Sequence, residues 1–171
     1  MSIVIKEAIS ETEREMALGV RLKVFIEEQG INPEREVDQF EKSSHYFLAL
    51  LNDIPVGAGR MRLKDSYCKF ERIATLKECR GKGVGKKMME FMHSYAHNHY
   101  PQFLPFMHAQ KSALSFYEKI GWEAVGDEFW EEEISHKVLI YPPKDPTLLA
   151  NLKTLTDRQV LEVIKKRLKN N

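Results

Sequence analysis

The chain has 171 residues, of which 43% are hydrophobic and 30% are charged, and its formal net charge is +1. This composition is typical of a globular protein with one sizeable core. It excludes a global basic field for nucleic acid, and no apolar run is long enough to span a bilayer. The start lacks a signal-peptide pattern, and the two cysteines, Cys68 and Cys79, form no CxxC pair. We therefore expect a cytoplasmic protein without nucleic-acid or membrane partners.

The first elements are a short strand and a capped helix. Residues 2–8 alternate between apolar and polar side chains, as a strand does. Ser10 and Glu13 form an S-x-x-E capping box, which predicts a helix from this point to about Gln29. The acidic stretch over residues 31–44 is expected to be a polar loop.

Three strand-like runs follow, and then a glycine-rich segment leads into a helix. The runs 45–51 and 56–63 flank the turn segment NDIP and predict a hairpin, with 67–76 as the third antiparallel strand. After Gly85, apolar residues recur at helical spacing.

The second half continues the alternation of strands and helices. Residues 103–109 form a short apolar strand, which the preceding crossover helix makes parallel to the fourth strand. A short helix then ends at Gly121, a C-cap residue, and two strands surround an acidic turn. The order β-α-β-β-β-α-β-α-β-β predicts a mixed α/β domain over residues 1–142. Residues 143–171 predict a helical extension packed on this domain or on a second subunit, as in a homodimer.

The glycine-rich segment RGKGVGK spans residues 80–86 and fails two common nucleotide motifs. A P-loop needs glycine where Arg80 stands and a hydroxyl where Lys87 stands. A dinucleotide fingerprint needs a third glycine where Lys86 stands.

A third interpretation is an anion cradle in front of a helix. Gly81 and Gly83 can turn backbone N–H groups toward one point, where the helix dipole favours an anion. Arg80, Lys82 and Lys86 add positive charge. The alternative is a flexible turn with solvated lysines.

Two segments resemble the sequence motifs of the GNAT-type N-acetyltransferase superfamily. FERIATLKECRGKGVGKKMM resembles its motif A, with R/Q-x-x-G-x-G/A between a strand and a helix, and FMHAQKSALSFYEKIGW resembles its motif B, with F-Y-x-x-x-G-F. VFIEEQGINPEREVD further resembles the small bacterial ElaA/YjcF-like branch. The resemblance covers residues 1–142 and implies that strands four and five splay apart at one end. It also implies acetyl-CoA as cosubstrate and no metal.

The resemblance implies a set of coenzyme-binding residues. The backbone of Ala74 and Leu76 would bind the pantetheine arm, and the amide of Ile73 or Ala74 would polarise the thioester carbonyl. Amides from Gly81 to Lys86 would hold the pyrophosphate. The expected coenzyme-binding residues are thus Ile73, Ala74, Leu76, Arg80, Gly81, Lys82, Gly83, Val84, Gly85 and Lys86.

Catalytic roles follow from the same resemblance. Tyr117 stands where the family has its general acid, with core packing as the alternative. Glu71, expected at the end of the fourth strand, is the first candidate for the general base; the alternative is an exposed carboxylate paired with Arg72 or a lysine. His108 stands where related sequences often have Asn. It either weakens a coenzyme contact or supplies the base, and a satisfied core histidine is the alternative.

The acceptor side is expected at the helix end that bears Glu28 and Gln29, with the following loop. Carboxylates there would attract a cationic amine, or they form a solvated helix terminus. Arg60 and Arg72 could equally bind a carboxylate. The predicted function is transfer of acetyl from acetyl-CoA to a primary amine of a small molecule or peptide, directly within a ternary complex. The alternative is a non-catalytic acyl-CoA-binding module.

Overall fold

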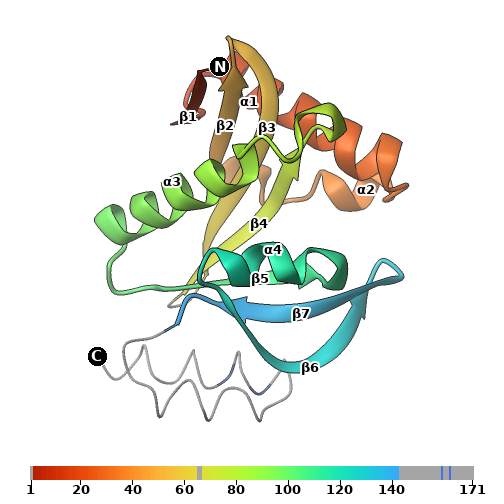
Figure 1. Ribbon diagram of the computed structural model, residues 1–171, viewed down its shortest axis with the longest axis vertical. Coiled ribbons are helices and arrows are strands. Elements are labelled where there is room, and N and C mark those ends of the chain that lie inside the picture. Colours follow the sequence, from red (N-terminus) through yellow and green to blue (C-terminus); the bar gives the residue numbers. More distant parts are fainter. Residues whose placement is uncertain (1, 65–66, 143–158, 160–161, 163–171) are drawn as a thin grey trace. The chain divides into compact units, whose positions relative to one another are not determined.

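The computed structural model describes residues 2–64 and 67–142, together with Gln159 and Glu162 (Figure 1). The strands lie in one mixed sheet in the order β1-β2-β3-β4-β5-β7-β6, with β4 and β5 parallel, and the predicted order of elements is confirmed. The strands are β1 (Ile3–Glu7), β2 (His45–Leu51), β3 (Ile54–Lys64), β4 (Tyr67–Thr75), β5 (Leu104–Gln110), β6 (Glu123–Glu131) and β7 (Ile134–Ile140). The α-helices are α1 (Glu11–Arg21), α2 (Pro33–Glu36), α3 (Val84–His99) and α4 (Leu114–Lys119). A π-helix, η1 (Leu22–Glu28), and the 3₁₀ helices η2 (Glu41–Ser43), η3 (Lys77–Cys79) and η4 (Lys111–Ala113) complete the described elements.

The chain divides into two compact units. Unit 1 comprises residues 1–62 and 70–95, and unit 2 comprises residues 63–69 and 96–171. The helical extension predicted over 143–171 lies outside the described residues, apart from Gln159 and Glu162.

The first helix begins at the predicted capping box. The Ser10 hydroxyl accepts a hydrogen bond from the Glu13 amide at 3.3 Å, and the Glu13 carboxylate accepts one from the Ser10 amide at 3.1 Å. The hydrogen bond from Lys6, with those from the backbone, lowers the pKa of Glu13 to about 2. The helix then widens into η1, where the amide of Gln29 donates to the carbonyl of Val24 at 3.1 Å. The prediction that the helix extends to about Gln29 is therefore confirmed, although it is an α-helix in its first part and a π-helix in its second.

Unit 1 packs helices on both faces of its strands because side chains alternate along β2. Tyr46 and Leu48 belong to a buried cluster with Val20 and Val24 from α1 and η1. Phe47 faces the other way and packs edge-on against Phe91 and Tyr95 of α3, at ring-centroid distances of 6.0 and 5.2 Å. The strands thus hold η1 on one face and α3 on the other.

Two glycines on β3 allow α3 to lie close to the strands. A Cβ atom on Gly59 would stand 2.6 Å from the sulfur of Met92, and one on Gly57 would stand 3.0 Å from a methyl of Val84. Val84 is the first residue of α3, so the start of this helix lies directly against β3.

Tight turns join both antiparallel hairpins that the sequence predicts. Asn52 and Asp53 join β2 to β3 with φ values of 50° and 64°, and Glu132 and Glu133 join β6 to β7 with 49° and 60°. Two successive left-handed residues match the twist of the flanking strands.

Each unit also holds one buried cysteine. Cys68 lies on β4 in the part that belongs to unit 2, and Cys79 lies at the end of η3 in unit 1. Burial raises the pKa of the Cys68 thiol to about 12. Both cysteines are therefore small core residues.

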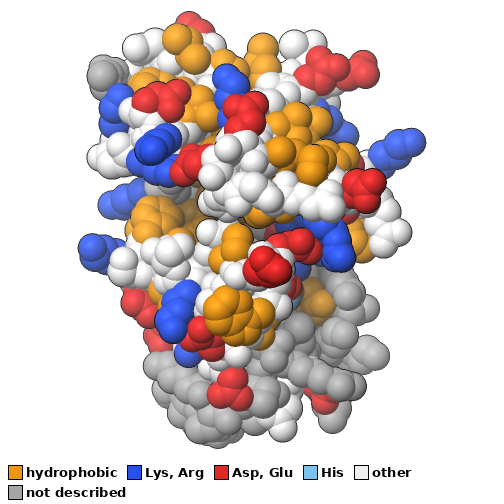
Figure 2. Space-filling model, turned by 90° about the vertical axis from the view of Figure 1, so that its right-hand side faces the viewer, with side chains coloured by type: hydrophobic (Ala, Val, Ile, Leu, Met, Phe, Trp, Pro, Cys, Tyr) orange, Lys and Arg blue, Asp and Glu red, His pale blue; other side chains and the backbone are white. Residues whose placement is uncertain are grey.

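The surface mixes charges of both signs. Figure 2 shows acidic, basic and hydrophobic side chains interspersed on one face of the molecule. Within the described part of the chain, no helix is both long enough and apolar enough to cross a bilayer.

Candidate active site

The glycine-rich segment has the backbone conformation that an anion cradle needs. Gly81 and Gly83 have φ values of +75° and +84°, and a Cβ atom on either would meet no atom within 4 Å. The backbone conformation, and not lack of space, therefore favours glycine here. The Gly83 carbonyl accepts the Lys87 amide at 3.1 Å, so Val84 and Gly85 lie in the first turn of α3, whose amides have no acceptor within the helix. This arrangement favours an anion.

Two of the charged side chains near the cradle, Arg80 and Lys86, have partners within unit 1. Arg80 donates to both carboxylate oxygens of Glu28, at 2.7 and 2.6 Å, and from Nε to the Thr75 carbonyl at 3.1 Å. The hydrogen bond from Arg80 lowers the pKa of Glu28. Lys86 lies 3.8 Å from Glu90 in an exposed pair. The structure thus brings together Arg80 and Glu28, which the sequence assigns to different substrates.

Leu76 differs from its expected role in binding pantetheine. Its amide donates to the carbonyl of Val56 at 2.9 Å, and its carbonyl accepts the amide of Cys79 at 2.8 Å. The amide is therefore not available to a ligand, because it completes the pairing of the chain with β3. The side chain of Ala74 lies in the buried cluster under η1.

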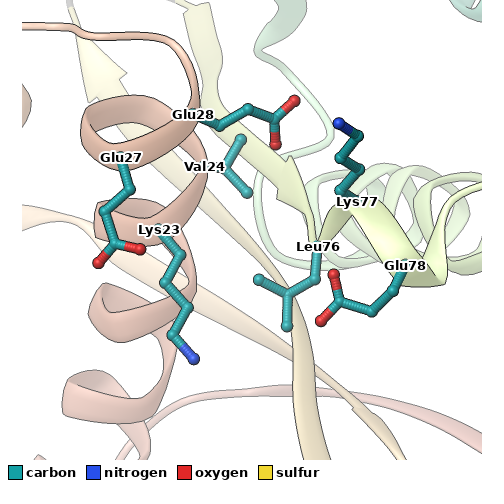
Figure 3. A pocket seen from close by; sticks show the side chains of 7 residues that line it. All are labelled: Lys23, Val24, Glu27, Glu28, Leu76, Lys77 and Glu78. Carbon is teal, nitrogen blue, oxygen red and sulfur yellow. The ribbon is translucent and has the colours of Figure 1, made fainter.

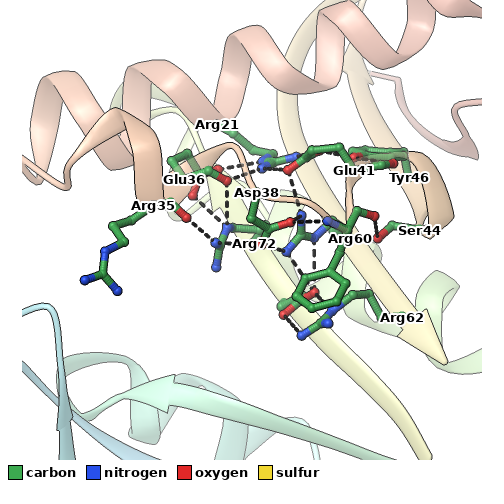
Figure 4. Close-up of polar contacts among 12 residues, drawn as sticks. Arg21, Arg35, Glu36, Asp38, Glu41, Ser44, Tyr46, Arg60, Arg62 and Arg72 are labelled. Carbon is green, nitrogen blue, oxygen red and sulfur yellow. Dashed lines mark hydrogen bonds and ion pairs between the residues drawn. The ribbon is translucent and has the colours of Figure 1, made fainter. Parts of the chain in front are cut away.

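A network of guanidinium and carboxylate groups lies beside η1, and Arg60 is at its centre (Figure 4). Arg60 is fully buried, donates to both oxygens of Asp38 at 2.8 and 2.7 Å and to Glu41 at 2.7 Å, and bonds Glu71 at 3.1 Å through Nε. It is thus not available to bind a substrate carboxylate, since three carboxylates of the protein already surround it.

Arg21 holds the other side of this network. It is also fully buried, and it bonds Glu36 at 2.6 Å and both oxygens of Glu41 at 3.0 and 2.9 Å. Glu41 also accepts from the hydroxyl of Tyr46. The predicted polar loop is therefore ordered as α2 and η2 by arginines from other elements.

Glu71 lies elsewhere than expected. It stands in the middle of β4, is 9% exposed, and forms ion pairs with Arg60 and Arg62. It is neither at the end of the strand nor an exposed carboxylate, because two arginines of β3 reach it across the sheet.

Arg72 is turned toward the loop by its backbone. Its φ of 56° is left-handed, which is unusual for a residue with a side chain. The guanidinium lies 2.7 Å from Glu36 and 3.5 Å from Asp38, and it donates to the Arg35 carbonyl at 2.9 Å.

Burial and arginines act in opposite directions on the carboxylates of the network. Burial alone would raise the pKa of Asp38 and of Glu41. Hydrogen bonds from Arg60 instead lower the pKa of Asp38 below its usual value, and hydrogen bonds from Arg21 lower that of Glu41. Burial prevails for Glu36 and raises its pKa. Sequence reasoning missed this network, although Arg60 and Arg62, two residues apart on one strand, indicate a basic strip.

In unit 2, Tyr117 is buried on α4. It is 8% exposed, its ring lies edge-on to Phe116 at 5.0 Å, and burial raises the pKa of its hydroxyl. The hydroxyl is therefore protonated at neutral pH, as a proton donor must be.

His108 is held by a carboxylate and two aromatic rings of unit 2. Its Nδ1 lies 2.8 Å from Glu131, and its ring lies 5.8 and 4.9 Å from the rings of Phe106 and Phe129. Burial would raise the pKa of Glu131, but His108 lowers it to about 2. Nε2 of His108 is buried and has no hydrogen-bond partner among the described residues.

A hollow of about 270 Å³ lies between η1 and the segment after β4 (Figure 3). Glu28 and Lys77 face each other across it, and Val24 and Leu76 give it an apolar lining. All its lining residues belong to unit 1: Lys23, Val24, Glu27, Glu28, Leu76, Lys77 and Glu78. No group of three or more metal-ligating side chains occurs in the described ranges.

The cradle, the sheet and the order of elements define the class of protein. The chain belongs to the GNAT acetyltransferases, since a family model described as "Acetyltransferase (GNAT) domain" matches residues 8–138. It is thus an acyl-CoA-dependent N-acyltransferase by family.

Individual proteins also resemble this chain, either in sequence or in structure. The uncharacterized N-acetyltransferase YjcF of Bacillus subtilis is 36% identical over 77% of this chain and 95% of its own length. The crystal structure of Escherichia coli ElaA matches with a TM-score of 0.72 at 21% identity, over 81% of this chain and 99% of that one. A GNAT acetyltransferase from Elizabethkingia anophelis, with acetyl-CoA bound, matches with a TM-score of 0.60 at 17% identity, over 81% and 94%. The resemblance to the family and to its ElaA/YjcF-like branch is confirmed.

Proposed function

We propose that this chain transfers acetyl from acetyl-CoA to a primary amine of a small molecule or peptide, directly within a ternary complex. The observation that carries the proposal is the cradle, where two left-handed glycines precede the first-turn amides of α3, which have no acceptor within the helix. A diphosphate suits this arrangement of donors and helix dipole. The acetyl-CoA bound to the Elizabethkingia neighbour supports the choice of coenzyme.

The backbone of β4 is proposed to position the thioester. The amide of Ile73 or Ala74 would donate to the thioester oxygen, which becomes negatively charged when the amine attacks. The amine nitrogen bonds to the carbonyl carbon, the carbon–sulfur bond breaks, and the sulfur leaves as a thiolate.

Tyr117 is proposed to protonate this thiolate. Its buried hydroxyl keeps its proton at neutral pH, because burial disfavours the phenolate. The donated proton converts the thiolate to a thiol, so coenzyme A leaves with a neutral sulfur.

The attacking amine must give up a proton, and two residues are proposed for this role. Both oxygens of Glu71 are engaged by arginines, through Arg60 and Arg62. His108 has one nitrogen on Glu131 and the other without a partner among the described residues, the arrangement of an oriented base. The geometry therefore favours His108 over Glu71.

Calorimetric titration of the purified protein with acetyl-CoA, coenzyme A and ATP tests the proposal. Micromolar binding of both coenzymes and none of ATP is the expected result, and amines are then screened by release of coenzyme A thiol. Binding without turnover across amine classes would favour a non-catalytic acyl-CoA-binding module. Absence of coenzyme binding in folded protein would overturn the proposal.

Replacement of Tyr117 by Phe tests the proton donor. We expect turnover to fall about 10²–10⁴-fold, the usual contribution of a general acid, with coenzyme A affinity unchanged. The control is Tyr141→Phe, which removes another hydroxyl from unit 2 and should preserve turnover. Wild-type turnover of Tyr117→Phe, with chemistry rate-limiting, would remove Tyr117 from this role.

A further inference from the structure

The ion pair between Glu28 and Arg80 joins two groups that serve different substrates in the proposed function. Arg80 directly precedes the cradle, where it would add positive charge for the diphosphate, and Glu28 lines the hollow. Their bidentate contact, at 2.7 and 2.6 Å, neutralises both charges. Neither residue can offer its full charge to a ligand while the pair is intact.

The pair lies at the surface, where a ligand can replace Glu28 as the partner of Arg80. The side chain of Arg80 is 43% exposed and that of Glu28 is 33% exposed. Ion pairs with this exposure contribute little net free energy, because water and salt screen them. A diphosphate in the cradle carries more negative charge than one carboxylate and has the amides of α3 in addition. It can therefore displace Glu28 from Arg80.

Release of Glu28 changes the charge of the hollow. While Arg80 holds Glu28, the carboxylates of Glu27 and Glu78 are balanced by the ammonium groups of Lys23 and Lys77. Once released, Glu28 adds one uncompensated negative charge. The hollow then favours a cation, with Val24 and Leu76 as an apolar lining for its carbon chain.

We propose that the Glu28–Arg80 pair is an exchangeable link between the two substrates, in which the coenzyme diphosphate takes over Arg80 and the released Glu28 holds an ammonium in the hollow. This inference rests on the proposed function. An ammonium that is paired with Glu28 keeps its proton, because a neighbouring carboxylate favours the charged form. It is therefore not the reacting nitrogen, since attack on a thioester requires a neutral amine. The acceptor is therefore a diamine, held at its charged end while its other nitrogen reacts.

The link makes the binding of the two substrates cooperative. If coenzyme A frees Glu28 for the diamine, the diamine must free Arg80 for coenzyme A by the same factor. An exposed pair limits this factor to about two- to fivefold.

Calorimetric titration with coenzyme A and putrescine, a simple diamine, tests the link. Saturating putrescine should tighten coenzyme A binding to the wild type about two- to fivefold. Glu28→Gln should tighten coenzyme A binding by a similar factor without putrescine, because Arg80 is released, and should abolish the coupling. Arg80→Gln should weaken coenzyme A binding. n-Butylamine can place its single ammonium on Glu28 and should produce similar coupling, but it has no second nitrogen to accept the acetyl group, so it should release much less coenzyme A thiol than putrescine.

The matched control is Glu27→Gln, which removes an equal charge from the same turn but leaves the contact with Arg80 intact. Its affinity for coenzyme A should change less than that of Glu28→Gln. Wild-type or weaker coenzyme A binding by Glu28→Gln would overturn the link, as would equal changes in the two variants. Release of coenzyme A thiol as fast with n-butylamine as with putrescine would overturn the diamine. If the wild type does not bind coenzyme A at all, the proposed function is overturned instead.

Discussion

Gly83 shows how a single backbone conformation defines the cradle. At φ +84°, a side chain would be strained although nothing crowds it. Gly83→Ala should therefore destabilise the cradle conformation by about 1–2 kcal/mol. We expect coenzyme A affinity to fall about five- to thirtyfold, as measured by calorimetry.

Gly85→Ala is the control for this substitution. Gly85 lies inside α3, where alanine is a better helix former, and the family motif accepts alanine at this position. Its coenzyme A affinity should stay near the wild-type value. Wild-type affinity of Gly83→Ala would show that binding does not need the left-handed conformation.

The backbone conformation is predictable from the sequence for some residues and not for others. Positive φ values at Gly81 and Gly83 are predictable, because only glycine adopts them without strain. The left-handed φ of Arg72 is not, since Glu36 and Asp38, more than thirty positions away along the chain, hold its side chain.

At the scale of elements, Gly59 controls the distance between β3 and α3. Its missing Cβ would stand 2.6 Å from the Met92 sulfur, so alanine there must displace a buried methionine. We expect Gly59→Ala to destabilise the fold by about 1–3 kcal/mol, as overpacking commonly does. Urea unfolding followed by circular dichroism measures this loss.

Gly19→Ala should have the opposite effect. Gly19 lies within α1, and a Cβ atom there would meet nothing within 4 Å. Alanine should stabilise the helix by up to about 1 kcal/mol. Equal stability of Gly59→Ala and the wild type would mean that Met92 repacks at no cost.

The existence of elements was predictable, but their hydrogen-bonding detail was not. Ser10 with Glu13 marks a helix start, and hydrophobic alternation with turn residues marks both hairpins. The change from α1 to the π-helix η1 leaves no such mark, because the side chains keep a helical pattern through Glu28.

At the scale of the whole molecule, the described residues include two fully buried arginines, Arg21 and Arg60. Arg60 is fully buried against Asp38, Glu41 and Glu71. Arg60→Met would remove the main partner of Asp38 and one of the partners of Glu41 and of Glu71, and we expect a loss of about 3–5 kcal/mol in unfolding free energy. Lys42→Met removes an exposed charge from the same loop and should change stability by less than about 0.5 kcal/mol.

The network also sets a dependence on pH. Asp38 and Glu41 have lowered pKa values in the folded state, so their contribution is complete above their unfolded pKa of about 4 and is lost at lower pH. Glu36, with a raised pKa, acts in the opposite sense. Between pH 7 and pH 3, Arg60→Met should therefore lose less stability than the wild type. An equal loss would show that Arg60 does not lower these pKa values.

Such a network exceeds what a sequence pattern reveals. The acidic loop and the arginines of β3 and β4 are recognisable separately, but they lie about twenty to forty positions apart along the chain. Only the packing of η1 beside these strands pairs them. The contact between Glu28 and Arg80 was not predictable for the same reason, because the two residues lie 52 positions apart along the chain.

The two buried cysteines make it possible to measure how often each unit of the fold opens locally. A thiol reacts with an alkylating reagent only as an exposed thiolate, so modification under native conditions waits for the surrounding structure to open. Cys68 belongs to unit 2 and Cys79 to unit 1. Peptide mass mapping after timed alkylation would therefore give separate opening rates for the two units, with no label introduced into the protein.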